Sequence, residues 1–130
     1  MGNNEDNTYE QLLKSIIDLT VESYRFKKVF ERVLLKLETG EQARYLGQLA
    51  WFNKKIDDAL LNCGLNIVNL ESQKYDIGMA ATPINIDEFD YNEILLVEQM
   101  IEPLIMSKNS IVKTGTMILG SVKWNMKRTM

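Results

Sequence analysis

The spacing of the hydrophobic residues changes once along this chain, at Gly64, and that change most constrains the fold. Over residues 12–37 apolar side chains recur at intervals of three and four, the spacing of one helix face, and residues 46–60 repeat the pattern. After Gly64 the spacing falls to two, beginning with Leu65 and Ile67. We therefore expect an α+β fold in which two helices precede a small, mostly antiparallel β domain.

The limits of the two helices are predicted from capping and breaking residues. Residues 8–11 have the capping-box form, a hydroxyl residue followed three positions later by Gln, so the first helix is expected to begin at Thr8. Gly40 is expected to end it. A second helix is predicted over residues 41–62 and should stop at Gly64. Because the connection is short, the two helices are expected to form an antiparallel hairpin.

The second half of the chain contains the signals of short strands. Pro103 cannot donate a hydrogen bond to a sheet, so its strand should bend or lie at an edge there. Residues 107–110 are predicted to form a hairpin turn, and residues 83–92 a polar loop. The predicted extended segments are Asp76–Thr82, Ile94–Met106 and Ile111–Val122. The expected organisation is a disordered N-terminus over residues 1–7, a helical dimerisation region over 8–64, a β domain over 65–123 and a tail over 124–130.

Composition and charge exclude several classes of protein. The 15 basic and 18 acidic residues are spread along the chain, and the net charge is −3, so nucleic acid is not an expected partner. The positive charges between Lys123 and Arg128 are interpreted as a solvated tail. The acidic N-terminus is unlike a secretory signal, and no apolar run is long enough to cross a membrane. With a single cysteine, Cys63, the chain is expected to be cytoplasmic.

The sequence lacks the residues that most enzyme chemistry requires. It contains no histidine, which excludes a Ser-His-Asp or Cys-His nucleophile and a His-containing zinc site. Its seven glycines form no phosphate-binding loop. We therefore expect no catalytic residue, cofactor or metal. Residues 87–90 hold a carboxylate cluster, which is interpreted as a solvated loop; a contact for a basic partner surface, a cation site or an acid-base pair remain alternatives.

Several short motifs resemble the GrpE family of nucleotide exchange factors for DnaK-type chaperones. Residues 10–19 are similar to the family's E-L-L-P-V-I-D-S/N-L stretch with one insertion, and residues 56–65 are similar to its leucine-rich helix end followed by G-V. Residues 75–77 stand where the family has F-D-P or L-D-P. Residues 100–104 and 111–119 occupy the places of its G-Y turn and its final V-L-R-P-A-M-V strand.

The chain also departs from the family pattern. The family's histidine after the Asp-Pro pair is replaced near Ala80. Its K-G-Y reads Glu102-Pro103-Leu104, and its R-P-A reads Lys113-Thr114-Gly115. The long N-terminal paired helix of typical members is missing, so the chain is expected to be either a divergent short member or one from which that helix was removed.

The resemblance implies a homodimer whose helix pairs form a four-helix bundle. It also implies that the β domain binds the ATPase domain of a DnaK-type chaperone and accelerates ADP release, with no covalent chemistry. The alternatives are a GrpE-like interaction scaffold that has lost exchange activity and binds another protein, and a small enzyme or ligand carrier using the carboxylates of residues 87–90. The residues expected at the dimer interface are Leu13, Ile16, Ile17, Tyr24, Leu49, Phe52, Ile56 and Leu60. The residues expected to face the chaperone are Tyr75, Met100, Lys108, Asn109, Lys113 and Leu119.

Overall fold

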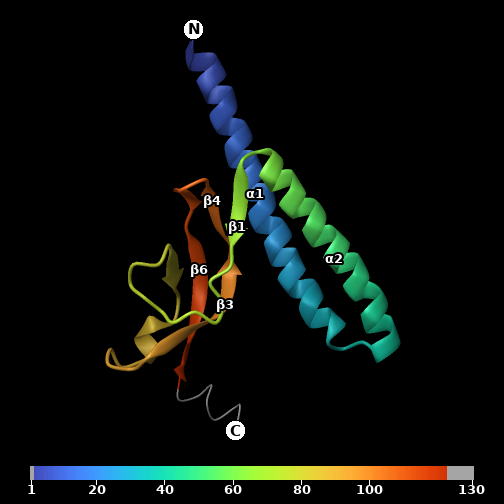
Figure 1. Cartoon of the computed structure of the whole chain (residues 1–130), viewed down its shortest axis with the longest axis vertical. Helices are drawn as coiled ribbons and strands as arrows, with labels where there is room; N and C mark the ends of the chain where they lie inside the picture. Colours follow the sequence, from blue (N-terminus) through green and yellow to red (C-terminus); the bar gives the residue numbers. More distant parts are fainter. Residues whose placement is uncertain (1, 123–130) are drawn as a thin grey trace. The chain divides into compact units, whose positions relative to one another are not determined.

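The computed structural model describes residues 2–122 of the chain, and within them the fold is α+β, as predicted (Figure 1). The chain divides into two compact units, Met1–Cys63 and Gly64–Met130. The first unit is helical and the second contains all the described strands. Neither helix of the described residues is both long and apolar enough to cross a membrane.

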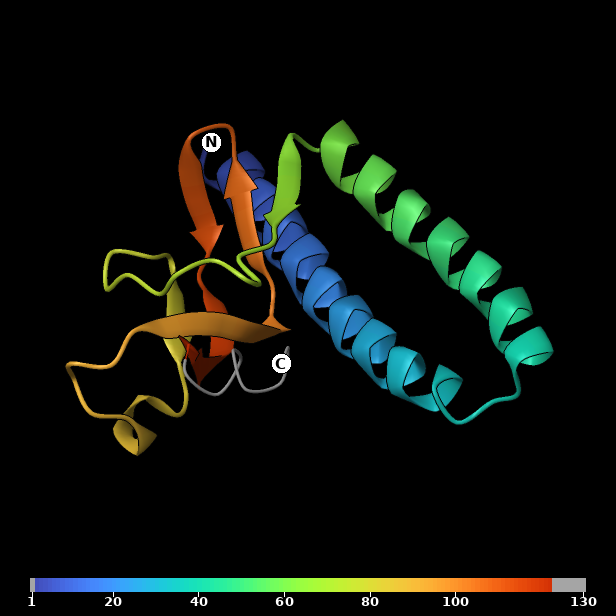
Figure 2. The same ribbon diagram turned by 60° about the horizontal axis from the view of Figure 1, so that its bottom comes forward.

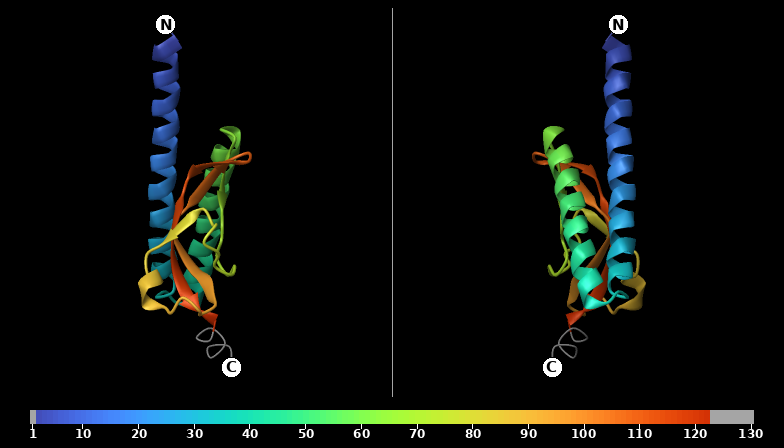
Figure 3. Two further views of the ribbon diagram at one scale, coloured as in Figure 1. Left: turned by 90° about the vertical axis from the view of Figure 1, so that its left-hand side faces the viewer. Right: turned by 90° about the vertical axis from the view of Figure 1, so that its right-hand side faces the viewer.

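The helical unit consists of α1 (Gly2–Leu34) and α2 (Thr39–Asn62). Figure 3 shows α1 as one continuous rod, and Figure 2 shows α2 running back beside the second half of α1. The helix begins six residues before the predicted start at Thr8, so the expectation of a disordered segment over residues 1–7 does not fit the described residues. Residues 3–7 contain no Pro or Gly that would break a helix, so the helix extends through them. The capping box at residues 8–11 therefore does not mark the start of α1.

The end of α1 also differs from the prediction, because Gly40 lies inside the first turn of α2. The helix stops at Leu34, where the backbone tightens: Lys36 N–H donates to the Val33 carbonyl oxygen at 3.0 Å. The side chain of Gln42 donates from Nε2 to the Leu34 carbonyl oxygen at 3.0 Å, which satisfies a carbonyl group left open by the helix end. The predicted stop of α2 at Gly64 is confirmed by the positive φ of 75° at that residue.

The β unit holds two three-stranded sheets. One has the order β1-β4-β5 and is antiparallel throughout; the other has the order β2-β6-β3, in which β3 pairs antiparallel and β2 pairs parallel with the central β6. The bend expected at Pro103 lies where the chain passes from β3 of one sheet to β4 of the other. The strand bounds are β1 Leu65–Val68, β2 Ala81–Pro83, β3 Leu95–Glu102, β4 Leu104–Ser107, β5 Ser110–Lys113 and β6 Gly115–Ser121.

Two local predictions in the β unit are confirmed. Pro103 separates β3 from β4, and Ser107 pairs with Ser110 across a two-residue hairpin loop. Lys108 in that loop has a φ of 51°, the left-handed conformation that tight hairpins use. The extended segment expected from Asp76 is shorter, since Asp76 Oδ1 accepts the Gly78 N–H at 3.2 Å and bends the chain before β2.

Residues 72–75 also pair with β3, on the edge away from β6, although they do not form a regular strand. Ser72 N–H donates to the Val97 carbonyl oxygen at 2.8 Å, and Tyr75 N–H donates to the Leu95 carbonyl oxygen at 2.7 Å. The loop that follows β2 contains the short 3₁₀ helix η1 (Ile86–Glu88). Asn85 fixes this loop to β6: its Nδ2 donates to the Leu119 carbonyl oxygen at 3.0 Å, and its Oδ1 accepts the Leu119 N–H at 2.9 Å.

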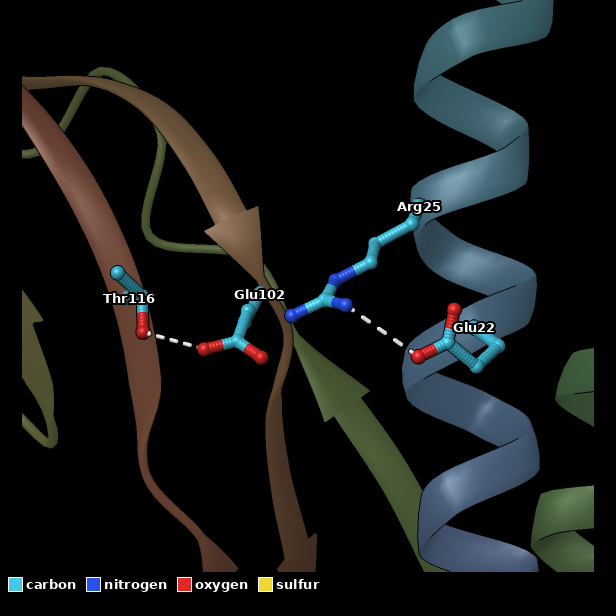
Figure 4. A network of polar contacts seen from close by, with 4 residues as sticks. All are labelled: Glu22, Arg25, Glu102 and Thr116. Atoms are coloured by element: carbon cyan, nitrogen blue, oxygen red, sulfur yellow. Dashed lines mark hydrogen bonds and ion pairs between the residues drawn. The ribbon is translucent and has the colours of Figure 1, made fainter.

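The best-buried side chains of the β unit come from its central strands. Met117 and Ile105 are 0% exposed. Polar contacts line the edges of this core: Thr116 Oγ1 of β6 donates to Glu102 Oε1 of β3 at 2.8 Å (Figure 4). Other side chains of this core are Leu65, Leu70, Ala81, Leu95, Val97, Met100, Leu104 and Leu119.

Candidate partner-binding surfaces

Aromatic side chains of α1 and α2 surround the larger cavity of the helical unit. Phe26 and Phe30 of α1 stack with ring centroids 6.2 Å apart, and Tyr45 of α2 approaches Phe30 edge-on at 6.4 Å. The cavity beside them has a volume of about 650 Å³. Phe26 and Phe30 line it, together with six residues of α2: Arg44, Gly47, Gln48, Leu49, Trp51 and Phe52. The two helices therefore leave an open, mostly apolar groove here that their own side chains do not fill.

A smaller cavity of about 210 Å³ lies near the other end of the helix pair. Leu60 of α2 lines it and is only 3% exposed, whereas Leu19 of α1 is 68% exposed. The remaining lining residues are Ile16, Thr20, Ser23, Ile56, Ala59 and Cys63. Both cavities indicate that α1 and α2 by themselves pack incompletely.

The residues predicted for the dimer interface fall into two groups. Tyr24, Leu49 and Leu60 are buried in a single chain, which leaves them little side-chain surface for a partner. They are better described as part of the chain's own packing, because both leucines line cavities between α1 and α2. The others are partly exposed: Leu13, Ile16, Ile17, Phe52 and Ile56.

The prediction missed the most exposed apolar row of α1. Leu12, Leu19, Phe26 and Val33 follow one another at intervals of seven and are 60%, 68%, 64% and 47% exposed. A seven-residue repeat keeps its members on one side of a supercoiled helix pair. We call this row, with its interleaved positions, the heptad seam. The interleaved positions, offset by four residues, are Tyr9, Ile16, Ser23 and Phe30.

Charged side chains of the helical unit lie on its exposed faces. Arg25 and Glu22 of α1 form an ion pair at 3.3 Å (Figure 4). Lys54 and Asp58 of α2 pair at 2.8 Å, and the hydrogen bond to Asp58 raises the pKa of Lys54 above its ordinary value. These pairs are solvent-exposed and contribute little to stability, but they help to keep the polar faces of the helices distinct from the apolar ones.

The residues predicted to face a chaperone are not all at the surface of the β unit. Lys108 and Asn109 are exposed at the tip of the β4–β5 hairpin, and Tyr75 is partly exposed. Met100 and Leu119 are each 1% exposed. Their predicted role as surface contacts is wrong, because both point into the core of the β unit.

Lys113 lies at the end of β5 and is partly exposed. Its Nζ donates to the Thr114 carbonyl oxygen at 3.1 Å. The hairpin tip and the end of β5 thus present three polar side chains that a partner can reach, Lys108, Asn109 and Lys113.

A second surface of the β unit combines aromatic and acidic side chains around a cavity of about 610 Å³. Tyr75, on the segment paired with β3, and Phe89, just after η1, contribute aromatic rings. The carboxylates come from Asp87, Asp90 and Glu93. The remaining lining residues are Lys74, Ile86, Tyr91, Ile94 and Leu95. We call this surface the acidic aromatic cavity.

Comparison with models of protein families, with curated proteins and with solved structures gives no match to this chain. The case for a function therefore depends on the sequence motifs and on the surfaces described above, namely the heptad seam, the hairpin tip and the acidic aromatic cavity.

The acidic residues do not make a metal site within the described residues. No three carboxylate or thiol side chains among them converge on one point that could hold an ion. Asp87 and Asp90 are exposed, and the Asp90 N–H donates to Glu93 Oε2 at 3.3 Å, so part of this carboxylate's capacity is used within the loop. The arrangement is suited to contact with a positively charged group instead of to ion chelation.

Proposed function

We propose that this chain is a GrpE-like co-chaperone that acts as a homodimer, binds the ATPase domain of a DnaK-type chaperone and accelerates the release of ADP. The observation that carries the proposal is the heptad seam. Two consecutive helices, the first with an open apolar row, followed by a separate β unit, are the order of parts that the GrpE resemblance implies. The proposal places the protein in the cytoplasm, where the exposed Cys63 thiol stays reduced.

The dimer is supported by the energetics of the seam. Fully burying a Leu, Val or Phe side chain contributes about 1.5 to 3 kcal/mol. Four such side chains stand in a row on α1 with roughly half or more of their surface in water. In the proposed assembly the two helices of each chain form an antiparallel hairpin, and two hairpins cover one another's apolar faces as a four-helix bundle.

In this proposal the β unit is the part that binds the chaperone. The accessible candidates for chaperone contact are Tyr75, Lys108, Asn109 and Lys113. Exchange needs no covalent chemistry from these side chains. The factor accelerates ADP release if it binds the open, nucleotide-free conformer of the ATPase domain more tightly than the closed one, because a ligand shifts an equilibrium only by its differential affinity.

The direct test measures release of fluorescent ADP from a DnaK-type chaperone after addition of the full chain. We expect faster release, and we expect Tyr75→Ala and Asn109→Ala to weaken the acceleration. Asn66→Ala is the matched control, because Asn66 is an exposed asparagine on β1 that was not assigned to the contact surface. Release that is no faster with the dimeric wild-type chain than without it would contradict exchange activity.

A second candidate function is that of an interaction scaffold with the same architecture and no exchange activity. The burial of Met100 and Leu119 favours it, because two of the positions assigned to chaperone contact through the resemblance offer no surface to a partner. The departures at Glu102-Pro103-Leu104 and Lys113-Thr114-Gly115 point the same way. Calorimetry of chaperone binding, combined with the ADP-release measurement, distinguishes the two functions. A chaperone that binds the chain without faster ADP release, or one that does not bind the chain, would favour the interaction scaffold.

A further inference from the structure

Backbone hydrogen bonds hold the walls of the acidic aromatic cavity. Leu95, at the start of β3, lines the cavity and is 7% exposed. The Tyr75 N–H donates to the Leu95 carbonyl oxygen at 2.7 Å, which fixes Tyr75 beside this strand. The Phe89 N–H donates to the Ile86 carbonyl oxygen at 3.2 Å and closes the turn of η1, in the loop that leads to β3 (Figure 2). The volume of about 610 Å³ is within the usual range of ligand pockets.

The aromatic rings of this cavity have no cation of the chain over their faces. In the helical unit, by contrast, Lys55 Nζ lies 5.5 Å from the centroid of the Trp51 ring. Within residues 2–122 no such contact involves Tyr75, Phe89 or Tyr91, and none of the three stacks on another ring. Their faces can therefore receive a cationic group from outside the described part of the chain.

The carboxylates of the cavity are not neutralised by the residues around them. Asp87, Asp90 and Glu93 supply three carboxylates, against one ammonium group, that of Lys74, so the lining is net negative. Asp87 and Asp90 are exposed, and within residues 2–122 neither forms an ion pair with Lys74. Both carboxylates can accept hydrogen bonds from a charged donor.

Rings and carboxylates together select one kind of cation. A quaternary ammonium group packs well on aromatic faces but has no N–H to donate to a carboxylate. A lysine ammonium group donates well but has no flat face to stack on a ring. The planar guanidinium group of arginine does both, because it stacks on aromatic rings and donates in pairs to carboxylates.

We propose that the acidic aromatic cavity binds an arginine side chain presented by a partner protein, with the guanidinium group against the aromatic rings and its N–H groups donating to Asp87 and Asp90. Arginine within a peptide chain is favoured over the free amino acid, because the free amino acid brings its own carboxylate into a net negative site. The inference is independent of the proposed co-chaperone function.

The experiment titrates the full chain with the end-capped peptide Gly-Gly-Arg-Gly-Gly and follows backbone amide signals by NMR. We expect the signals of residues 86–95 to shift, and the arginine peptide to bind severalfold more tightly than Gly-Gly-Lys-Gly-Gly, which carries the same charge. Asp87→Asn with Asp90→Asn should weaken both peptides severalfold. Tyr91→Leu should narrow the difference between the peptides, since the rings distinguish them and the carboxylates attract both. Tyr91 is fully exposed, so its replacement leaves the core intact.

The matched control, Glu5→Gln with Asp6→Asn, makes the same change of net charge at exposed positions of α1 and should leave both affinities unchanged. Equal affinity of the parent chain for the two peptides would overturn the proposal. So would equal weakening by the control, which would show attraction to net charge alone. Tighter binding of a trimethyllysine peptide would reassign the cavity to quaternary ammonium groups, and equally tight binding of free arginine would reassign it to a small molecule. Because Tyr75 is kept in every variant, failure here leaves the ADP-release test unaffected.

Discussion

The two units of this chain differ in how much of their apolar surface is buried. In the β unit, seven large apolar side chains of β3, β4 and β6 are at most 7% exposed. In the helical unit, few side chains are buried, and large apolar residues stay exposed along both helices. The exposed ones in α1 and α2 are Tyr9, Leu12, Leu19, Phe26, Val29, Val33, Leu46, Trp51 and Leu61.

This difference bears on the proposed dimer. A pair of helices can bury only the stripe where they face each other, and two cavities remain even there. Two small sheets can enclose a core within one chain. We therefore expect the β unit to be stable by itself and the helical unit to gain its stability from a second chain.

The largest expected effect tests the packed core of the β unit. Ile105→Ala on β4 removes a side chain that is 0% exposed and should lower the free energy of unfolding by about 2 to 5 kcal/mol. Ile111→Ala is the matched control, because β5 pairs with β4 and Ile111 is 54% exposed. Denaturant unfolding measures both. Equal losses for the two isoleucines would contradict the closed core.

The next largest effect tests the open seam of the helical unit. Replacing Leu19 and Phe26 together by alanine should weaken the dimer by about 2 to 4 kcal/mol, because each lost side chain is lost from both copies. Sedimentation equilibrium gives the dissociation constant. Lys14→Ala serves as the control, since Lys14 is exposed on α1 outside the seam. A dimer that keeps its affinity after the double substitution, or a wild-type chain that is monomeric, would show that the seam has another role.

A smaller effect concerns the loop that Asn85 fixes to β6. Asn85→Ala removes both hydrogen bonds to the Leu119 backbone and leaves an N–H and a carbonyl oxygen without partners. The expected loss is about 1 to 3 kcal/mol of unfolding free energy. Asn66→Ala on the exposed side of β1 should cost much less. Hydrogen exchange at the Leu119 amide is a second readout, and an unchanged rate there would contradict the role of Asn85.

Sequence alone predicted the features of this fold that depend on nearby residues. The change of period at Gly64 separates helices from strands, and Pro103 and the turn at residues 107–110 break the β half at the right places. Each of these signals is local, because it arises from the backbone chemistry of one or a few residues. The early end of α1 depends on a side chain eight residues away, Gln42, and was missed.

The burial of individual strand residues could not be predicted, because it depends on pairing between distant strands. The pairing of β3 with β6 shifts register between Val97 and Gln99 and again between Met100 and Glu102. Each irregularity changes which side chains face the core, so simple alternation gave no reliable side for Met100. Leu119 is buried because β6 lies between β2 and β3, an arrangement that no local pattern indicates.

The heptad seam was present in the sequence but was read with the wrong period. A spacing of 3.6 spreads the apolar residues of α1 over one broad stripe, and the predicted interface residues were taken from it. A spacing of 3.5 selects Leu12, Leu19, Phe26 and Val33. The two periods differ little over one heptad, and only the exposure of these side chains separates the open row from the buried one.

Adding one methyl group at a glycine should change stability with opposite signs in the two units, and the change at Gly47 is the smallest effect expected. A Cβ added at Gly47 of α2 meets nothing within 4 Å, so Gly47→Ala should stabilise the helix by about 0.5 to 1 kcal/mol. At Gly115 of β6 the same Cβ would lie 2.7 Å from Met100 Cε and 3.1 Å from the Glu102 carbonyl oxygen, so Gly115→Ala should destabilise the β unit by about 1 to 3 kcal/mol.

Unfolding of each variant by circular dichroism measures the signs, and the dissociation constant of the dimer adds a further distinction at Gly47. Gly47 lines the larger cavity of the helical unit, where an added methyl group has room in a single chain. If Gly47→Ala stabilises the helices and also weakens the dimer, the second chain packs closely over this cavity. If it leaves the dimer unchanged, the seam of α1 alone forms the contact. Destabilisation of the helical unit would show that the space around Gly47 is already filled.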